Sequence, residues 1–137
     1  MRALITELDA YLQALYPAQS NHLVPVAALR RHNVVFLVAR LASELVGCGA
    51  LVDLGEYAEI KRMYVRPDRR GAGVGRAILD ALATQARERG LRWLRLETGI
   101  AQPQAQALYE RAGFKLRGPF GQYREDPLSL FMERDLE

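Results

Sequence analysis

The chain has 137 residues, 50% of them hydrophobic, and we expect residues 1–137 to form a single domain around one core. The net charge of +3 is modest, and arginines alternate with acidic residues, which argues against a nucleic-acid-binding protein. The one cysteine, Cys48, excludes an internal disulfide and a cysteine-based zinc site, and the two histidines show no ligand spacing, so we predict no metal. Because the sequence has neither an apolar run of about 18 residues nor a secretory signal, we expect a cytoplasmic protein with no membrane partner.

The first half of the chain predicts two helices followed by three strands. Apolar residues recur at helical spacing over residues 3–16, and a short second helix is expected after Pro25. Runs rich in β-branched and apolar residues then predict strands over residues 33–40, 45–52 and 57–65. The polar connection between the first two runs is typical of an antiparallel hairpin.

Glycines and prolines divide the second half of the chain. A glycine-rich loop precedes a helix that Gly90 ends, and the next helix begins at Pro103 and ends at Gly113. The first of these helices has a predicted buried stripe, formed by Val74, Ala77, Ile78, Ala81 and Leu82. Strands are expected over residues 91–97, 114–116 and 128–132. The resulting order, α(α)βββαβαββ, predicts a mixed α/β fold and lacks the regular alternation of a doubly wound sheet.

The loop Arg70-Gly71-Ala72-Gly73-Val74-Gly75 lies between a strand and a helix. Unpaired backbone N–H groups and the positive end of the helix dipole would meet there and form an anion site, although an ordinary turn remains an alternative. A P-loop is excluded, because Arg76 and Ala77 stand where that motif needs lysine and a hydroxyl residue. A dinucleotide-binding fold stays open, since Glu97 supplies the acid that it needs, but Arg76 replaces its third glycine.

Three ordered segments resemble the GNAT superfamily of acyl-CoA-dependent N-acetyltransferases. Residues 58–67 and 70–79 are similar to the family's central strand and pyrophosphate loop. Residues 102–114 contain the sequence Leu-Tyr-x-x-x-Gly-Phe, and residues 121–132 resemble the tail of a bacterial subgroup. The resemblance implies the family's fold, a mostly antiparallel mixed sheet with helices on both faces. Helical periodicity begins so early in this chain that we expect the family's first strand to be missing.

The resemblance also implies where acetyl-CoA binds. The loop amides would hold the pyrophosphate between Arg70 and Arg76, and the strand carrying Met63 and Val65 would pair with the pantetheine arm. The Met63 N–H would meet the thioester oxygen. Gln102 takes a position where the family often has asparagine. The implied cofactor-binding residues are Met63, Tyr64, Val65, Arg70, Gly71, Ala72, Gly73, Val74, Gly75, Arg76 and Gln102.

Two residues are predicted to act in catalysis. An alkylamine is mostly protonated at neutral pH, so transfer needs a general base, and Glu59 has the spacing of the strand glutamate in the histone-modifying branch. Its alternative role is an ion pair with Lys61 or Arg62. Tyr109 matches the tyrosine that often protonates the departing thiolate in this family, and its alternative role is core packing.

The sequence therefore predicts an acetyl-CoA-dependent N-acetyltransferase that acetylates an amine of a small molecule or protein by direct transfer in a ternary complex. A non-catalytic acyl-CoA sensor would need the same loop but neither Glu59 nor Tyr109. A two-step route through Cys48 is a further alternative, but the sequence singles out no base to activate this thiol. The sequence does not determine the oligomeric state, and a homodimer stays open because dimers are frequent among the proteins that this chain resembles.

Overall fold

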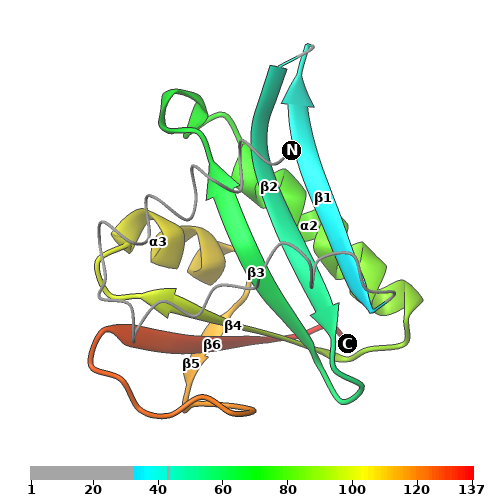
Figure 1. Cartoon of the computed structure of the whole chain (residues 1–137), viewed down its shortest axis with the longest axis vertical. Helices are drawn as coiled ribbons and strands as arrows, with labels where there is room; N and C mark the ends of the chain where they lie inside the picture. The colour runs from blue at the N-terminus through cyan, green and yellow to red at the C-terminus, as the bar shows by residue number, and fades with distance from the viewer. Residues whose placement is uncertain (1–32, 43) are drawn as a thin grey trace.

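The structure is a computed structural model that describes residues 33–42 and 44–137 (Figure 1). The expected helices over residues 3–16 and after Pro25, and the question of a missing first strand, fall outside the described residues. The strands are β1 (Val34–Leu41), β2 (Glu44–Asp53), β3 (Ala58–Val65), β4 (Trp93–Gly99), β5 (Lys115–Arg117) and β6 (Ser129–Asp135). The helices are the short 3-10 helix η3 (Pro67–Arg69), α2 (Val74–Glu88) and α3 (Pro103–Arg111).

The strands form one six-stranded sheet in the order β1-β2-β3-β4-β6-β5. Strands β1, β2 and β3 form an antiparallel meander, β3 and β4 pair in parallel, and β4, β6 and β5 are antiparallel. The prediction of a mixed, mostly antiparallel sheet is confirmed. The dinucleotide-binding alternative is wrong, because that fold needs a parallel sheet built from repeated crossovers.

Helix α2 crosses one face of the sheet behind β1, β2 and β3 (Figure 1). Its buried face comprises Val74, Ile78, Leu79, Leu82, Ala83 and Ala86. The prediction that Ala77 and Ala81 are buried is wrong, since both are exposed. Alanine tolerates either environment, so the larger side chains alone fix which side of the helix faces the sheet.

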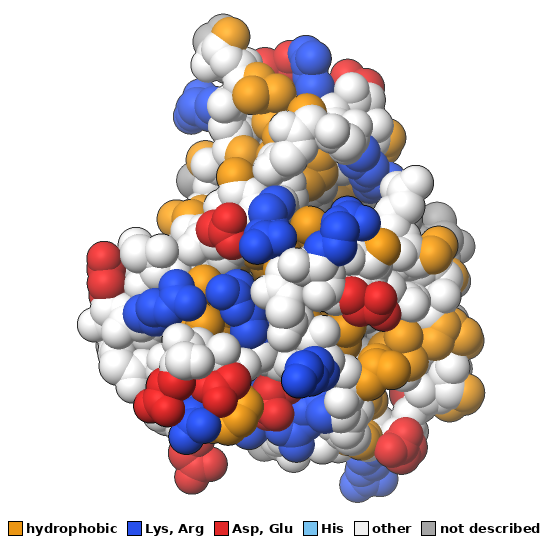
Figure 2. All heavy atoms as spheres, turned by 180° about the vertical axis from the view of Figure 1, so that it is seen from behind, with side chains coloured by type: hydrophobic (Ala, Val, Ile, Leu, Met, Phe, Trp, Pro, Cys, Tyr) orange, Lys and Arg blue, Asp and Glu red, His pale blue; other side chains and the backbone are white. Residues whose placement is uncertain are grey.

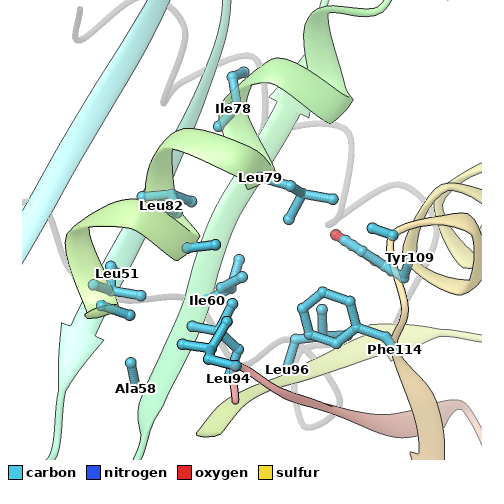
Figure 3. Close-up of a cluster of buried hydrophobic side chains, with 14 of the residues drawn as sticks. Leu51, Ala58, Ile60, Ile78, Leu79, Leu82, Leu94, Leu96, Tyr109 and Phe114 are labelled. Carbon is cyan, nitrogen blue, oxygen red and sulfur yellow. The ribbon is translucent and has the colours of Figure 1, made fainter. Parts of the chain in front are cut away.

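The core lies between α2, the sheet and α3. Leu79 and Leu82 of α2 point towards Leu94 and Leu96 of β4 and towards Tyr109 of α3 (Figure 3). Each fully buried leucine stabilises the fold by about 1.5–3 kcal/mol. Because α2 and α3 contribute to the same cluster, both described α-helices lie on one face of the sheet. The prediction of helices on both faces stays a prediction, because the expected helices over residues 3–16 and after Pro25 lie outside the described residues.

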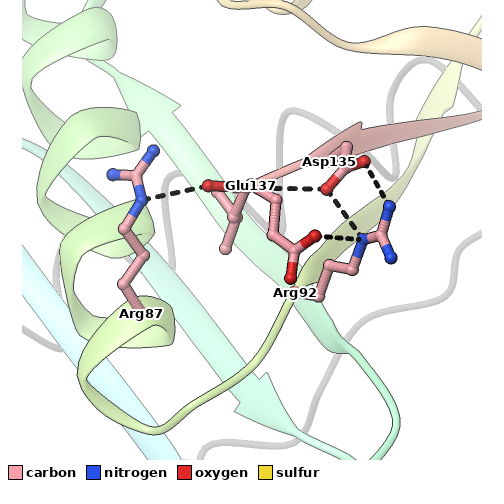
Figure 4. Close-up of polar contacts among 5 residues, drawn as sticks. Arg87, Arg92, Asp135 and Glu137 are labelled. Carbon is pink, nitrogen blue, oxygen red and sulfur yellow. Dashed lines mark hydrogen bonds and ion pairs between the residues drawn. The ribbon is translucent and has the colours of Figure 1, made fainter.

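Polar contacts fix the C-terminal end of β6 beside β4 and α2 (Figure 4). Arg92 donates two hydrogen bonds to Asp135, at 3.0 and 2.9 Å, and Arg87 of α2 donates to the Leu136 carbonyl at 3.5 Å. The Arg92–Asp135 pair is exposed and contributes little energy, but its bidentate geometry sets the direction of the strand end. In the two described ranges, no helix is both long and apolar enough to span a bilayer.

Candidate active site

A cleft opens where β3 and β4 separate. The two strands pair only from Ala58 to Ile60, opposite Leu94 to Leu96. Beyond that point β3 continues beside β2 as far as Val65, whereas β4 continues beside β6. The separation leaves a cleft of about 960 Å³ whose walls are the second half of β3, the start of α2, and α3.

A β-bulge accompanies this separation. The register of β2 against β3 shifts between Cys48 and Ala50, and Arg62 on the opposite strand has a φ of 60°. A non-glycine residue in this left-handed region costs about 1–2 kcal/mol. The buried Cys48 thiol donates a hydrogen bond to the Arg62 carbonyl at 3.2 Å and so supports the bulge. Cys48 does not line the cleft, which disfavours the two-step route.

The backbone of β3 presents hydrogen-bonding groups to the cleft. The Arg66 N–H donates to the Val46 carbonyl of β2 at 2.8 Å. Because strand N–H groups alternate in direction, those of Val65 and Met63 point away from β2 and into the cleft. Arg70 folds back over this edge and donates from its Nε to the Val65 carbonyl at 3.0 Å. The second half of β3 is therefore an open strand edge, bordered by an arginine.

The glycine loop leaves the start of α2 accessible. Gly73 is the N-cap of α2 with a φ of 83°, and a Cβ atom there would meet nothing within 4 Å. No side-chain hydrogen bond caps the helix. Gly75 has another role, since its Cβ would lie 2.8 Å from Leu108 Cδ2, so glycine lets α3 pack against α2. The helix N-terminus thus faces the cleft with its amides uncovered, as an anion site requires.

Most of the predicted cofactor-binding residues line this cleft. They are Met63, Tyr64, Val65, Arg70, Gly71, Gly73, Val74, Gly75, Arg76 and Gln102. Ala72 is not among the lining residues. The sequence analysis missed several others, which are Arg69, Ala101, Pro103, Gln104, Ala105, Ala107, Leu108 and Arg111. Most of these lie on α3, but only Ala105 stands at helical spacing from Tyr109, so periodicity counted from that residue would not have indicated the others.

Tyr109 lies in the cleft wall on α3. Its side chain is 6% exposed, and its ring packs edge-on against Phe114 with 5.8 Å between the centroids. Burial raises the pKa of Tyr109 above its usual value of 10, and the negative charge of Glu97 raises it further. The phenol therefore stays protonated at neutral pH. The ring of Tyr109 thus packs in the core, and its phenol keeps the proton that a general acid must donate.

Glu59 lies on β3 but does not line the cleft. It accepts a hydrogen bond of 2.5 Å from the Tyr123 hydroxyl and forms an ion pair of 3.3 Å with Lys61. Lys61 also donates to the Tyr123 hydroxyl at 2.9 Å. The ion pair with Lys61 agrees with the alternative role stated for Glu59, and Tyr123 is a partner that the sequence analysis missed. The carboxylate is 6% exposed in total, so the contacts compensate its burial.

Known proteins share this fold and this sequence pattern. The model of the Acetyltransferase (GNAT) family matches residues 1–114. An IAA acetyltransferase from Azospirillum brasilense is 52% identical over 135 residues, which are 97% of this chain and 88% of that protein. A crystal structure described as an acyl-CoA N-acyltransferase from Klebsiella pneumoniae has a TM-score of 0.82 at 42% identity, covering 98% of this chain and 88% of that chain.

A more distant structure shares the fold. PaiA N-acetyltransferase from Thermoplasma acidophilum, crystallised with coenzyme A, has a TM-score of 0.68 at 23% identity and covers 75% of this chain and 61% of that chain. At that identity the likeness concerns the fold alone. The family match and the close relative determine the assignment. This chain belongs to the GNAT family of acetyltransferases and is an N-acetyltransferase.

Proposed function

We propose that this enzyme binds acetyl-CoA in the cleft between β3 and β4 and transfers the acetyl group directly to an amine. The observation that carries the proposal is the open edge of β3 beside the uncovered N-terminus of α2. A pantetheine arm carries amides and can pair with such an edge, while its pyrophosphate meets the α2 amides. PaiA, which shares this fold, was crystallised with coenzyme A, and this supports CoA as the ligand.

The reaction needs one nucleophile and one leaving group. The amine nitrogen attacks the thioester carbon, and the carbonyl electrons move to oxygen, where the Met63 N–H would stabilise the oxyanion. Collapse of this intermediate breaks the carbon–sulfur bond. The CoA sulfur takes a proton from the Tyr109 hydroxyl, the attacking nitrogen gives up one proton to a general base, and that proton returns to the Tyr109 phenolate through water before the next turnover. The relatives named above are acetyltransferases, which favours this enzyme over a non-catalytic sensor.

The direct test is acetyl-CoA titration by calorimetry, followed by thiol release assays. The acceptor panel includes alkylamines, amino acids, peptide amines and IAA, the compound in the name of the Azospirillum relative. NADH is titrated as a control, because a loop that binds dinucleotides would bind it as well. Acetyl-CoA binding with amine-dependent thiol release supports the proposal; binding without release for any acceptor would favour the sensor. Size-exclusion chromatography determines whether the enzyme is a homodimer, and fractionating cells tests a cytoplasmic location.

Glu59 is our proposed general base, acting through water because neither its carboxylate nor its partner Tyr123 lines the cleft. In Glu59→Gln, kcat/KM at pH 7 is expected to fall roughly 10²-fold, the lower end of a general base's contribution. The loss should shrink as the pH rises, because the acceptor amine then loses its proton without help. Steady-state rates between pH 6 and 10 measure this change.

Glu133→Gln is the matched control for Glu59→Gln. Glu133 is also a carboxylate held in an ion pair within the sheet, in its case by Arg95 at 2.7 Å. Its loss is expected to leave the pH profile unchanged. Equal profiles for wild type and Glu59→Gln would remove Glu59 from the mechanism and leave it as the ion-pair partner of Lys61.

A further inference from the structure

Four arginines line the cleft, namely Arg69, Arg70, Arg76 and Arg111. Two of them are held by neighbours on the β3 side. Arg69 forms an ion pair of 2.8 Å with Glu44. Arg70 donates to the Val65 carbonyl at 3.0 Å, and its guanidinium lies 5.8 Å from the centre of the Tyr64 ring. These contacts fix the two side chains at the β3 wall.

The other two arginines lie where α2 meets α3. Arg76 is held by Asp80, with 3.1 Å between the paired atoms, and also donates to the Arg111 carbonyl at 3.2 Å. The exposed Arg111 side chain makes no hydrogen bond or ion pair with the part of the chain that the structure describes. Within that part, Arg111 is thus the cleft arginine whose guanidinium is available to a ligand.

The position of Arg111 is fixed even though its side chain is exposed. Gln104, Ala107 and Arg111 all line the cleft, and their spacing places them along one side of α3. One turn before Arg111, Leu108 packs against Gly75, where a Cβ atom would approach to 2.8 Å. The last turn of α3 is therefore held beside the N-terminus of α2. The face that carries α2 shows several cationic side chains near its middle (Figure 2).

We propose that Arg111, assisted by Arg76, binds the 3′-phosphate of CoA and makes the enzyme prefer CoA over 3′-dephospho-CoA. This inference rests on the proposed function. The α2 amides and Arg70 suffice for the pyrophosphate, whereas the 3′-phosphate carries nearly two further negative charges at neutral pH. A guanidinium matches phosphate geometry with two parallel hydrogen bonds. Arg111 is the cation that the cleft offers for this second group.

The experiment compares CoA with 3′-dephospho-CoA by calorimetry for the wild type and for Arg111→Gln. The wild type is expected to bind CoA roughly tenfold more tightly than 3′-dephospho-CoA. This factor corresponds to the free energy of one charge-assisted hydrogen bond at an exposed site. In Arg111→Gln the affinity for CoA should fall by about that factor, while the affinity for 3′-dephospho-CoA stays within twofold. The difference between the ligands should also shrink in 0.5 M salt, because exposed charges are screened.

Arg124→Gln is the control, since it removes the same charge from an exposed residue outside the cleft. It should keep the wild-type preference. If Arg111→Gln weakens both ligands equally, Arg111 contacts the pyrophosphate and the proposal is wrong. An unchanged preference in Arg111→Gln also overturns it. Failure of the wild type to bind either ligand would instead refute the proposed function, so the two failures are distinguishable.

Discussion

Replacing Gly73 with aspartate is expected to weaken acetyl-CoA binding roughly a hundredfold or more. Gly73 caps α2 at the point where the amides face the cleft. A carboxylate there would repel the pyrophosphate and occupy the amides that should bind it, and like charges brought together cost several kcal/mol. The Cβ atom itself meets nothing within 4 Å, so the fold should survive. Calorimetry measures the affinity, and thermal unfolding measures the stability.

Gly55→Asp is the control that shows whether backbone strain alone could explain the loss of binding in Gly73→Asp. Gly55 also has a positive φ, 91°, and an added Cβ would again meet nothing within 4 Å, but it lies in the turn before β3 and outside the cleft. Both variants should lose about 1–2 kcal/mol of stability from the left-handed conformation. Gly55→Asp should still bind acetyl-CoA like the wild type. Normal binding by Gly73→Asp would show that the phosphates bind elsewhere.

Tyr109→Phe is expected to lower kcat roughly 10²-fold while leaving the affinity for acetyl-CoA almost unchanged. The substitution removes the proton donor but keeps the ring that packs against Phe114. Because burial and Glu97 raise the pKa of Tyr109 above 10, its phenol should remain protonated throughout the assay range. Wild-type kcat should therefore show no decrease up to pH 10 from loss of this proton. Stopped-flow and steady-state thiol release test both statements.

Tyr57→Phe is the control for the loss of a hydroxyl. Tyr57 packs edge-on against Phe120, 5.5 Å between ring centroids, and does not line the cleft. Its kcat should match that of the wild type. If Tyr109→Phe also keeps full activity, the thiolate leaves without this acid, and the buried tyrosine serves the core alone. With an acetyl-CoA analogue whose CoA portion ends in a more acidic thiol, Tyr109→Phe should lose less activity, because that thiolate leaves more easily without a proton.

Glycine and proline made much of the fold predictable from the sequence. Pro103 begins α3 as expected, and Gly90 and Gly113 follow the two helices with φ values of 76° and 96°. These residues act through local backbone geometry, which the sequence states directly. The loop from Gly71 to Gly75 was located for the same reason. Its position beside an open strand edge, however, depends on how two distant strands pair.

Features that depend on distant contacts were not predictable. The hydroxyl that binds Glu59 comes from Tyr123, 64 residues later in the chain. The bulge places a positive φ at Arg62, a residue other than glycine, so the sequence contains no residue type that predicts it. Ala77 and Ala81 carry too little apolar surface to fix which side of α2 is buried, and the structure exposes both. Arg111 was missed because its place at the cleft depends on how α3 packs against Gly75.

The open edge of β3 has a consequence for the empty enzyme. Unpaired strand groups attract the strands of other molecules, which makes such edges sites of aggregation. A bound pantetheine arm would occupy the edge as an additional strand does. Ligand that binds only the folded chain at 100 times its Kd stabilises it by about 2.7 kcal/mol. The melting temperature should therefore rise with the acetyl-CoA concentration, and protein purified with CoA should stay monodisperse longer than protein stripped of it.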